Sequence, residues 1–393
     1  MPGPLAGIRV IELTTMITGP LAGMLLADLG AAVIKIENPA GGDPFRSFRG
    51  GRYSGHFIAY NRNKRSLTLD LRAAEAKDVF LKLVRDADVL IDNFRPGVLD
   101  RLGLQYDVLA KTNPRLIHAS ITGFGPDGPY RDRPSYDAVA QSLSGVLSQF
   151  VDPASPQVAG PTLSDNVTGF YAAYAILAAL YERERTGKGR RIETSMLEST
   201  IAFAPDGFIN ARRHGIKAGQ LTRVSVSQSY AFRCQDGRLI ALHLSSQEKF
   251  WAGLLAALER PDLATHKDFA TREQRIANYT ALREELGKTF ATRPRVEWAA
   301  RLEAEDVPYA PVLDVEEVMD DPQVRHLETF YRVAHPVEGE VWGVYPPVRF
   351  DGARPGPIAP PPTLGEHTEE ILRELGLDTS ARDALKRNKV VEE

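Results

Sequence analysis

The motif SDNVTG at 164–169 places the carboxylate of Asp165 directly before an apolar run at 170–181. The apolar run predicts a helix, and the start of a helix offers unpaired backbone N–H groups and the positive end of the helix dipole to a negative charge. Two interpretations follow. Asp165 caps the helix, or it is a nucleophile whose attack on a carbonyl is assisted by the helix terminus. The local sequence does not distinguish them.

A second motif that could bind a ligand, DNFRPG, occupies 92–97 and is followed by Arg101. It comes after a predicted strand, and open α/β sheets bind ligands at the carboxyl ends of their strands. Asn93 and Phe94 are suited to hold and stack an adenine, while Arg95 and Arg101 are suited to bind phosphate groups. The alternative is an ordinary strand-to-helix turn with solvated arginines.

Cations are concentrated between positions 46 and 65 of a chain whose net charge is −3. Such a cluster in an acidic chain is a candidate anion site, and a solvated loop is the alternative interpretation. The side chains concerned are Arg46, Arg49, Arg52, Arg62, Lys64 and Arg65.

Several familiar motifs are incomplete in this sequence. Residues 123–128 fit G-x-G-x-x-G, but Pro129 and Pro134 follow, so no helix starts there to hold a pyrophosphate. A P-loop match ending at 287–289 lacks its first glycine. The histidines form no zinc-binding pattern and Cys234 is the single cysteine, so we expect neither a metal site nor a disulfide.

Composition narrows the class of protein. The 393 residues are 43% apolar and 25% charged, which is ordinary for a globular chain with a sizeable core. The small net charge argues against a strongly basic protein that binds nucleic acid or membrane surfaces. The longest apolar run is shorter than the about 18 residues that a membrane span needs, and the first residues show no secretory pattern. We therefore expect a cytoplasmic protein without membrane or nucleic-acid partners.

The elements that must position these motifs alternate along the first third of the chain. Short β-type runs separated by helical patterns predict βαβ units, and hence a Rossmann-like α/β fold with an open parallel sheet covered on both faces. From residue 136 the pattern becomes mainly helical. Strands are predicted at 8–13, 32–36, 67–71, 89–92, 116–121 and 191–195, and later helices at 138–150, 167–185 and 196–212.

A change in composition near residue 214 predicts a second domain. We predict a large Rossmann-like domain over 1–212, a linker over 213–224 and a small α+β domain over 225–315. The remaining residues, 316–393, are predicted to return and complete the large domain with C-terminal helices. The small domain is expected to begin with a hairpin at 229–244.

Segments spaced along nearly the whole chain resemble the class III CoA-transferase family, which includes formyl-CoA:oxalate, carnitine and succinyl-CoA:dicarboxylate CoA-transferases. Each segment is a weak match alone, but their order and spacing together are highly specific. Among them are LAGIRVIELT, GPLAGMLLADLGAAVIKIENPAGGD, DVLIDNFRPGVLDRLGL and SDNVTGFYAAYAILAALYERERTGKGRRIETSML.

The resemblance implies that Asp165 is the catalytic nucleophile. Its carboxylate attacks an acyl-CoA to give a mixed anhydride, CoA then becomes esterified to Asp165, and an acceptor carboxylic acid repeats the exchange. CoA is thus part of the substrate, and no permanently bound cofactor or metal is expected. The family's CoA-contacting positions correspond to Thr18, Leu69, Arg72, Asn93, Phe94, Arg95, Arg101 and Met196.

Departures from the family pattern bear on the acceptor acid. Formyl-CoA transferases carry Gln at the position of Ile17 in the substrate pocket and Arg at the position of Asn38, and their glycine-rich lid has no counterpart at 215–220. Oxalate is therefore not the expected acceptor, and a larger dicarboxylate fits better. The candidate anchors for its distal carboxylate are Arg46, Arg49 and Arg52.

The related α-methylacyl-CoA racemases are the alternative function. They use a His–Asp pair, and their histidine corresponds to Tyr136, the second predicted residue of the substrate pocket. A phenol with a pKa of about 10 is a poor general base at neutral pH, which favours a transferase. The resemblance further implies an interlocked homodimer in which each chain threads the other.

Overall fold

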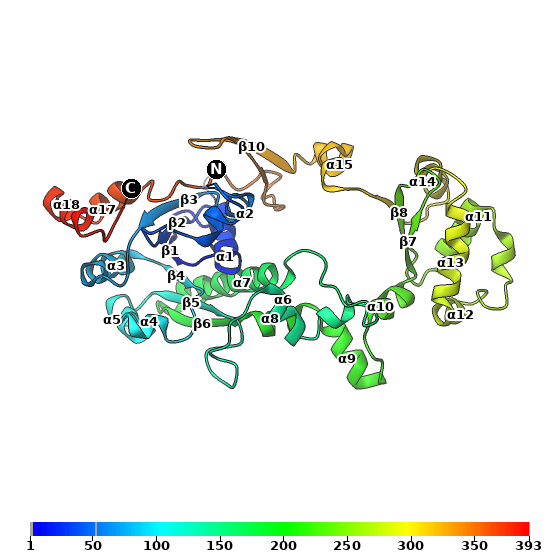
Figure 1. The fold of residues 1–393 in the computed structure, drawn as a ribbon, viewed down its shortest axis with the longest axis horizontal. Coiled ribbons are helices and arrows are strands. Elements are labelled where there is room, and N and C mark those ends of the chain that lie inside the picture. Colours follow the sequence, from blue (N-terminus) through cyan, green and yellow to red (C-terminus); the bar gives the residue numbers. More distant parts are fainter. Residues whose placement is uncertain (1–2, 52, 393) are drawn as a thin grey trace. The chain divides into compact units, whose positions relative to one another are not determined.

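The chain folds into two compact units, seen in a computed structural model that describes residues 3–51 and 53–392 (Figure 1). Unit 1 contains the described residues up to Leu147, then Gly160–Pro205, and those from Glu328 onward. Unit 2 contains Ser148–Ala159 and Asp206–Leu327. Unit 2 thus extends beyond the predicted small domain of 225–315 at both ends.

Unit 1 is built on a six-stranded sheet of order β3-β2-β1-β4-β5-β6, and every neighbouring pair is parallel. The strand order reverses between β1 and β4, where Ile11 pairs with Ile34 on one side and Leu90 on the other. The predicted open parallel sheet is confirmed, and this reversal is where such sheets form a ligand crevice. The strands are β1 (Arg9–Leu13), β2 (Ala32–Glu37), β3 (Lys64–Thr68), β4 (Val89–Asp92), β5 (Ile117–Thr122) and β6 (Arg190–Ser195).

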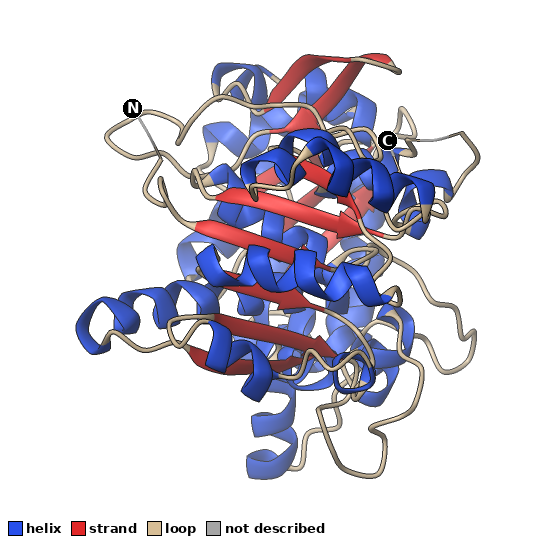
Figure 2. Cartoon of the chain, turned by 90° about the vertical axis from the view of Figure 1, so that its left-hand side faces the viewer, coloured by secondary structure: helices blue, strands red, loops and turns tan. Residues whose placement is uncertain are grey.

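Helices lie over both faces of this parallel sheet (Figure 2). Unit 1 also contains a hairpin formed by β10 (Phe330–His335) and β11 (Gly339–Val344). Its helices are α1 (Thr18–Asp28), the short 3-10 helix η1 (Pro44–Ser47), α2 (Gly55–Tyr60), α3 (Ala74–Asp86), α4 (Val98–Arg101), α5 (Tyr106–Thr112), α6 (Asp137–Leu143), α7 (Leu163–Thr186), α8 (Met196–Phe203), α17 (Thr368–Glu374) and α18 (Thr379–Arg387), with the 3-10 turn η2 (Leu147–Gln149) at its border with unit 2.

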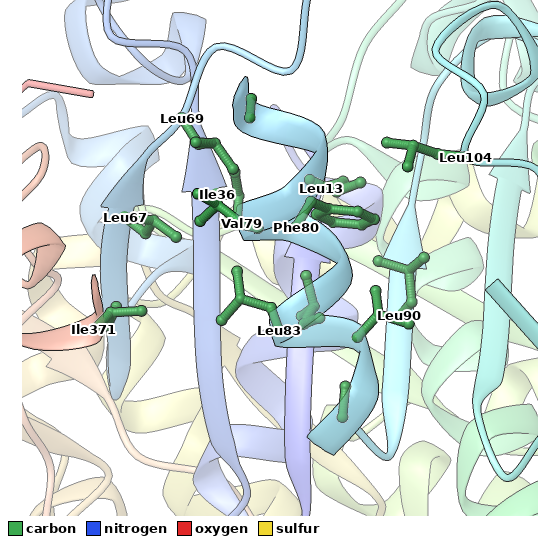
Figure 3. Packing of buried hydrophobic residues seen from close by; sticks show 14 of the residues in the cluster. Leu13, Ile36, Leu67, Leu69, Val79, Phe80, Leu83, Leu90, Leu104 and Ile371 are labelled. Carbon is green, nitrogen blue, oxygen red and sulfur yellow. The ribbon is translucent and has the colours of Figure 1, made fainter. Parts of the chain in front are cut away.

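Alternating strand residues point into two separate apolar layers. Leu90 of β4 belongs to the layer under α3, α5, α17 and α18, whereas Val89 and Ile91 belong to the layer under α1 and α7. In Figure 3, Phe80 of α3 lies over the strand residue Leu13, with further leucines and isoleucines around it. Burial on both faces explains why the central strand β4, with the sequence VLID, is almost entirely apolar.

The C-terminal segment covers the β3 edge of the sheet, where the backbone N–H of His367 donates to the carbonyl of Ser66 at 3.0 Å. The backbone N–H of Asp70 donates to the carbonyl of Val390 at 2.8 Å, and the backbone N–H of Glu392 donates to Thr68 Oγ1 at 2.8 Å. Val390 and Val391 are buried, with 1% and 2% of their surface exposed. The last residues of the chain therefore complete the layer under α3.

Unit 2 combines an antiparallel sheet of order β7-β8-β9 with helices packed on one apolar cluster. Phe232 of β7 stacks on Phe290 with ring centroids 4.5 Å apart. The elements are α9 (Pro205–His214), α10 (Gln220–Ser227), β7 (Ser229–Arg233), β8 (Leu239–His243), α11 (Glu248–Leu258), the 3-10 helix η3 (Pro261–Ala264), α12 (Arg272–Ala277), α13 (Tyr279–Phe290), α14 (Arg295–Ala304), β9 (Tyr309–Val312), α15 (Val315–Asp320) and α16 (Pro322–His326).

Two expectations near the border between the units are wrong. The helix predicted at 196–212 is broken between α8 and α9 at Pro205, because proline has no N–H to continue the hydrogen-bond ladder. The segment 213–224, expected to be an irregular linker, contains the start of α10.

Candidate active site

Asp165 is the third residue of α7, because the helix begins at Leu163 and Thr162 occupies the N-cap position. The interpretation of Asp165 as the helix cap is therefore wrong. Its backbone N–H donates to Asp137 Oδ1 at 3.2 Å. Within residues 3–51 and 53–392, no hydrogen bond or ion pair reaches its half-buried carboxylate. A carboxylate near a helix N-terminus with no partner of its own is available to react.

Burial and the nearby charge of Asp137 raise the pKa of Asp165 to about 7. Both causes act by disfavouring the ionised carboxylate. A carboxyl group with such a pKa is a stronger base than an ordinary aspartate, and it titrates close to neutral pH. The site thus contains one carboxyl group whose environment differs sharply from that of a solvated side chain.

The helices α1 and α7 pack closely beside this carboxylate. A Cβ atom on Gly169, one turn after Asp165, would lie 2.8 Å from the carbonyl oxygen of Thr18 and 3.0 Å from the Leu21 side chain. Only glycine permits this approach of the two backbones. Thr18 and the turn before α1 are thereby held against the part of α7 that carries Asp165.

The carboxamide of Asn93 is directed into the protein. Its Oδ1 accepts from the backbone N–H of Thr15 at 3.0 Å, while its Nδ2 donates to the Thr15 carbonyl at 2.8 Å and to Thr18 Oγ1 at 3.2 Å. Asn93, at the carboxyl end of β4, therefore fixes the turn at the carboxyl end of β1. Its predicted role as a CoA contact remains a prediction.

A cavity of about 390 Å³ opens at the reversal point of the sheet, between the carboxyl ends of β1, β2 and β4. Four of the predicted CoA-contacting residues line it together: Leu69, Arg72, Phe94 and Arg101. Arg72 is bound to Asp70, with two N···O distances of 2.8 Å. Across the described part of the chain, Arg101 makes no ion pair, so its guanidinium is available to an anionic ligand.

A second cavity of about 240 Å³ adjoins the first, and Phe94 lines both. Arg95 is part of its wall. The wall of this second cavity also contains a buried pair, in which His118 Nε2 is 2.7 Å from Asp92 Oδ2. The predicted CoA contacts therefore divide between two neighbouring cavities on either side of Phe94.

Three predicted residues lie elsewhere. Ile17 is buried in a small apolar cluster with Phe45 and Phe57, so its side chain packs in the protein interior. Met196, the first residue of α8, is buried, and its sulfur is 3.9 Å from Ser135 Oγ. Tyr136 precedes α6 and is 67% exposed.

Most members of the cationic cluster are already paired with carboxylates of the protein, so the cluster as a whole is not an anion site. Arg46, a candidate anchor for the acceptor, is 3% exposed and forms a bidentate pair with Glu37, so it cannot hold a distal carboxylate. Arg49 is exposed, and Arg52 lies outside the described residues. The ion pairs are Arg46–Glu37, Arg62–Asp28, Lys64–Glu12 and Arg65–Glu374, with N···O distances of 2.7, 2.5, 2.8 and 3.0 Å.

Asp137 is the residue of this site that the sequence analysis missed. Its Oδ1 accepts the Asp165 N–H, and its Oδ2 accepts from Gln141 Nε2 at 2.6 Å. The one sequence signal is an acidic residue in the first turn of a helix, which is common and carries no information about its partner. Only the packing of α6 against α7 brings the two carboxylates together.

The described residues contain no group of three or more His, Cys, Asp or Glu side chains that are arranged to hold a metal ion. None of the helices in this same part of the chain is long and apolar enough to cross a membrane.

The fold is that of an α/β protein whose parallel sheet has a cavity at the carboxyl ends of its strands, the place where such sheets bind ligands. Residues 5–368 match the model of CoA-transferase family III. The chain belongs to this family and is a class III CoA-transferase.

Characterised relatives agree with this assignment. Acetyl-CoA:oxalate CoA-transferase of Acetobacter aceti is 38% identical over 82% of this chain and 84% of its own length. Succinyl-CoA:glutarate CoA-transferase of Homo sapiens is 33% identical over 95% and 86%. The crystal structure of a CAIB/BAIF family protein from Brucella suis is 34% identical, covers 95% of this chain and 100% of its own, and has a TM-score of 0.84.

Proposed function

We propose that this CoA-transferase works through covalent intermediates on Asp165. The carboxylate oxygen of Asp165 attacks the acyl-CoA carbonyl carbon, the C–S bond breaks, and CoA leaves as its thiolate. The thiolate then attacks the Asp165 carbonyl carbon of the mixed anhydride. This step releases the donor acid as a carboxylate and leaves CoA as a thioester on Asp165.

The acceptor acid reverses these two steps. Its carboxylate attacks the aspartyl thioester and expels CoA thiolate, which gives a second mixed anhydride. The thiolate attacks the acceptor's acyl carbon, forming the product thioester and freeing the Asp165 carboxylate. No bond is made to water, and each proton state is restored at the end of the cycle.

The observation that carries this proposal is the carboxylate of Asp165, which is half-buried, close to a helix N-terminus and without a partner among the residues that the structure describes. The N–H groups of that terminus favour the negative charge that develops on the attacked carbonyl. Binding energy from the CoA moiety in the cavity that Phe94 and Arg101 line is available to stabilise the reactive intermediates.

The test is intact-protein mass spectrometry after mixing with succinyl-CoA. Wild type is expected to gain the mass of CoA less one water, and Asp165→Ala is expected to gain nothing and to transfer no CoA to any acid. Asp127→Ala, which changes another aspartate of unit 1, is the matched control. Full transfer by Asp165→Ala, or exchange of the Cα proton without an acceptor acid, contradicts the proposal.

We propose a dicarboxylic acid as the acceptor. The named activities of the two relatives above, on oxalate and on glutarate, support a dicarboxylate. Of the predicted anchors, Arg46 is engaged with Glu37, and Arg49 is exposed, so we take Arg49 as the candidate that holds the distal carboxylate. A series of dicarboxylates of increasing length should be used with monocarboxylates as controls, and Arg49→Ala is expected to raise the KM of the dicarboxylate about tenfold. An unchanged KM in Arg49→Ala removes this residue as the anchor.

We further propose an interlocked homodimer, with cytoplasmic location as the accompanying expectation. Large apolar side chains stand exposed on α7, among them Phe170, Tyr174 and Tyr181, at 56%, 70% and 69% exposure. Such a surface favours association with a second copy. Light scattering should give twice the chain mass, and tagged and untagged dimers should not exchange chains without denaturant. Rapid exchange would contradict interlocking.

A further inference from the structure

The turn at 14–18, between β1 and α1, contains a residue in a conformation that its type disfavours. Met16 has a φ of 70°, in the left-handed region. A non-glycine residue in this region loses about 1–2 kcal/mol relative to the right-handed alternative. It stays there only when surrounding contacts determine the conformation, so the contacts of this turn identify what holds it.

Asp43 is the side chain that holds Met16. The Met16 backbone N–H donates to both carboxylate oxygens of Asp43, at 3.1 and 3.3 Å. Asp43 Oδ1 also accepts from the backbone N–H of Phe45 at 2.9 Å. Asp43 is 1% exposed, so its carboxylate acts in the low-dielectric interior, where a charge-assisted hydrogen bond is strong.

Lys35 fixes both Asp43 and Thr14, the first residue of the turn. Its ammonium lies 3.0 Å from Asp43 Oδ2 and 3.1 Å from Glu12 Oε1, and it donates to the carbonyl of Thr14 at 2.7 Å. The Lys35 side chain is 0% exposed. One buried cation thus links the carboxylate that holds Met16 with the carbonyl two residues before it.

The turn contacts both the cavity and, through Thr18, the helix that carries Asp165. Thr14 and Thr15 line the 390 Å³ cavity. On the other side, the Thr18 carbonyl abuts the backbone of α7 at Gly169. A displacement of the turn therefore changes how the cavity lies relative to that helix.

We propose that Asp43 and Lys35 are positioning residues for CoA transfer, which hold Met16 in its left-handed conformation and thereby fix the turn that contacts both the CoA cavity and the helix of Asp165. This inference rests on the proposed role of Asp165 and goes beyond it. Because Phe94 and Arg101 line the cavity from other elements, loosening the turn should lower kcat and leave the KM for acyl-CoA nearly unchanged.

Two charge-neutral double variants test the hydrogen bond to Met16. Both remove one buried cation and one buried anion, so neither leaves an unpaired charge. Lys35→Met with Asp43→Asn keeps an acceptor for the Met16 N–H and should lose about threefold in kcat. Lys35→Met with Asp43→Leu removes the acceptor and should lose about 10- to 100-fold, because small misplacements near reacting atoms are costly.

Rescue by glycine separates positioning from general support of the core. Glycine adopts positive φ without penalty, so adding Met16→Gly to the Lys35→Met, Asp43→Leu variant should restore about threefold or more of kcat. The single variant Met16→Val leaves all the buried charges in place, and a β-branched residue disfavours this φ. Met16→Val should lower kcat, whereas Met16→Asn should retain more activity, because asparagine tolerates the left-handed region better. If the double variants do not fold, the comparison of Met16→Val with Met16→Asn tests the positioning role instead.

Wild type and Asp165→Ala in the same assay keep the two proposals apart. Activity of Asp165→Ala equal to wild type overturns the nucleophile role, whatever the turn variants do. If transfer requires Asp165, then equal kcat for the Asn and Leu double variants, or a loss that Met16→Gly does not reverse, overturns the positioning role.

Discussion

At the scale of single residues, the pair Asp165 and Asp137 sets an expected pH dependence. Burial and the Asp137 charge raise the pKa of Asp165 to about 7, and only the ionised carboxylate is a nucleophile. The transfer rate should therefore fall as the pH drops through about 7 and level off above it. Initial rates at saturating acyl-CoA across about pH 5.5–8.5 measure this inflection.

Asp137→Asn should move the inflection to lower pH. The substitution removes the negative charge that helps to raise the pKa of Asp165, while the amide oxygen still accepts the Asp165 N–H. Burial remains, so the pKa should stay above that of a solvated aspartate. An inflection that does not move in Asp137→Asn would show that the rate reports a different group.

The two arginines of the larger cavity should differ in their importance for CoA. Arg101 has no ion-pair partner among the described residues, whereas Arg72 is bound to Asp70. A hydrogen bond to a charged group contributes about 1.5–3 kcal/mol, so Arg101→Met should raise the KM of acyl-CoA roughly 10- to 100-fold. Arg72→Met, the matched control, should raise it less than about threefold, and equal effects would contradict the distinction.

Residue type predicted which side chains could take part in catalysis or binding. It did not predict which of them are held by ion-pair partners within the protein. Phe94 and Arg101 were singled out from their place after a strand, and they do line a cavity. Arg46 and Lys64 belong to the separate cationic cluster that charge alone marks as a candidate anion site, yet each is buried in an ion pair. Their partners, Glu37 and Glu12, lie on neighbouring strands, and such pairing depends on tertiary structure that no local pattern encodes.

At the scale of secondary-structure elements, the contact of α1 with α7 is expected to tolerate only glycine at 169. Alanine there would place its Cβ 2.8 Å from the Thr18 carbonyl oxygen, and overpacking of this kind costs about 1–3 kcal/mol. This loss should exceed the gain of about 1 kcal/mol in helix propensity. Gly169→Ala should therefore lower the urea midpoint of unfolding.

Gly287→Ala is the matched control, since it is the same substitution inside another helix. Its Cβ would meet only the Phe232 ring, at 3.8 Å, which is an ordinary contact. Helix propensity should then dominate, with a stabilisation of about 0.5–1 kcal/mol. Destabilisation by both substitutions would argue against the specific contact at Gly169.

The periodicity of the sequence predicted the type of most elements in unit 1, but not all of their bounds. The third strand was expected at 67–71, whereas β3 is Lys64–Thr68. The structure buries Lys64 in the strand, and a charged residue inside a buried strand breaks the apolar pattern on which the prediction relied. The apolar pattern resumes only at Leu67, one residue before the end of β3.

At the scale of the whole molecule, the last residues of the chain should be required for stability. Val390 and Val391 are buried, and the Val390 carbonyl accepts from Asp70 at the sheet edge. Each fully buried valine contributes about 1.5–3 kcal/mol, so truncation after Lys389 should lower the free energy of unfolding by about 3 kcal/mol or more. Thermal unfolding measures it, with the exposed Glu392→Ala as control; equal melting temperatures for the truncated and full chains would contradict this role.

The overall topology was accessible from the sequence because βαβ alternation leaves few arrangements. The open parallel sheet follows from that alternation, and the return of residues 316–393 to the large domain was expected from the family resemblance. The order of the strands in the sheet was not predicted. The extent of unit 2 was not accessible. Its residues 148–159 precede α7, and their membership in unit 2 rests on long-range packing.

The covering of the β3 edge by the C-terminal segment has a consequence for protein synthesis. The apolar layer under α3 includes Leu385 and Val390, which are synthesised after residues 206–327 of unit 2, and unit 2 has a core of its own. During translation, all residues of the unit 2 core are therefore available while the layer under α3 still lacks part of its apolar residues. Incompletely packed apolar layers and unpaired strand edges invite association with other chains, so we expect the risk of aggregation to fall once these residues have been added.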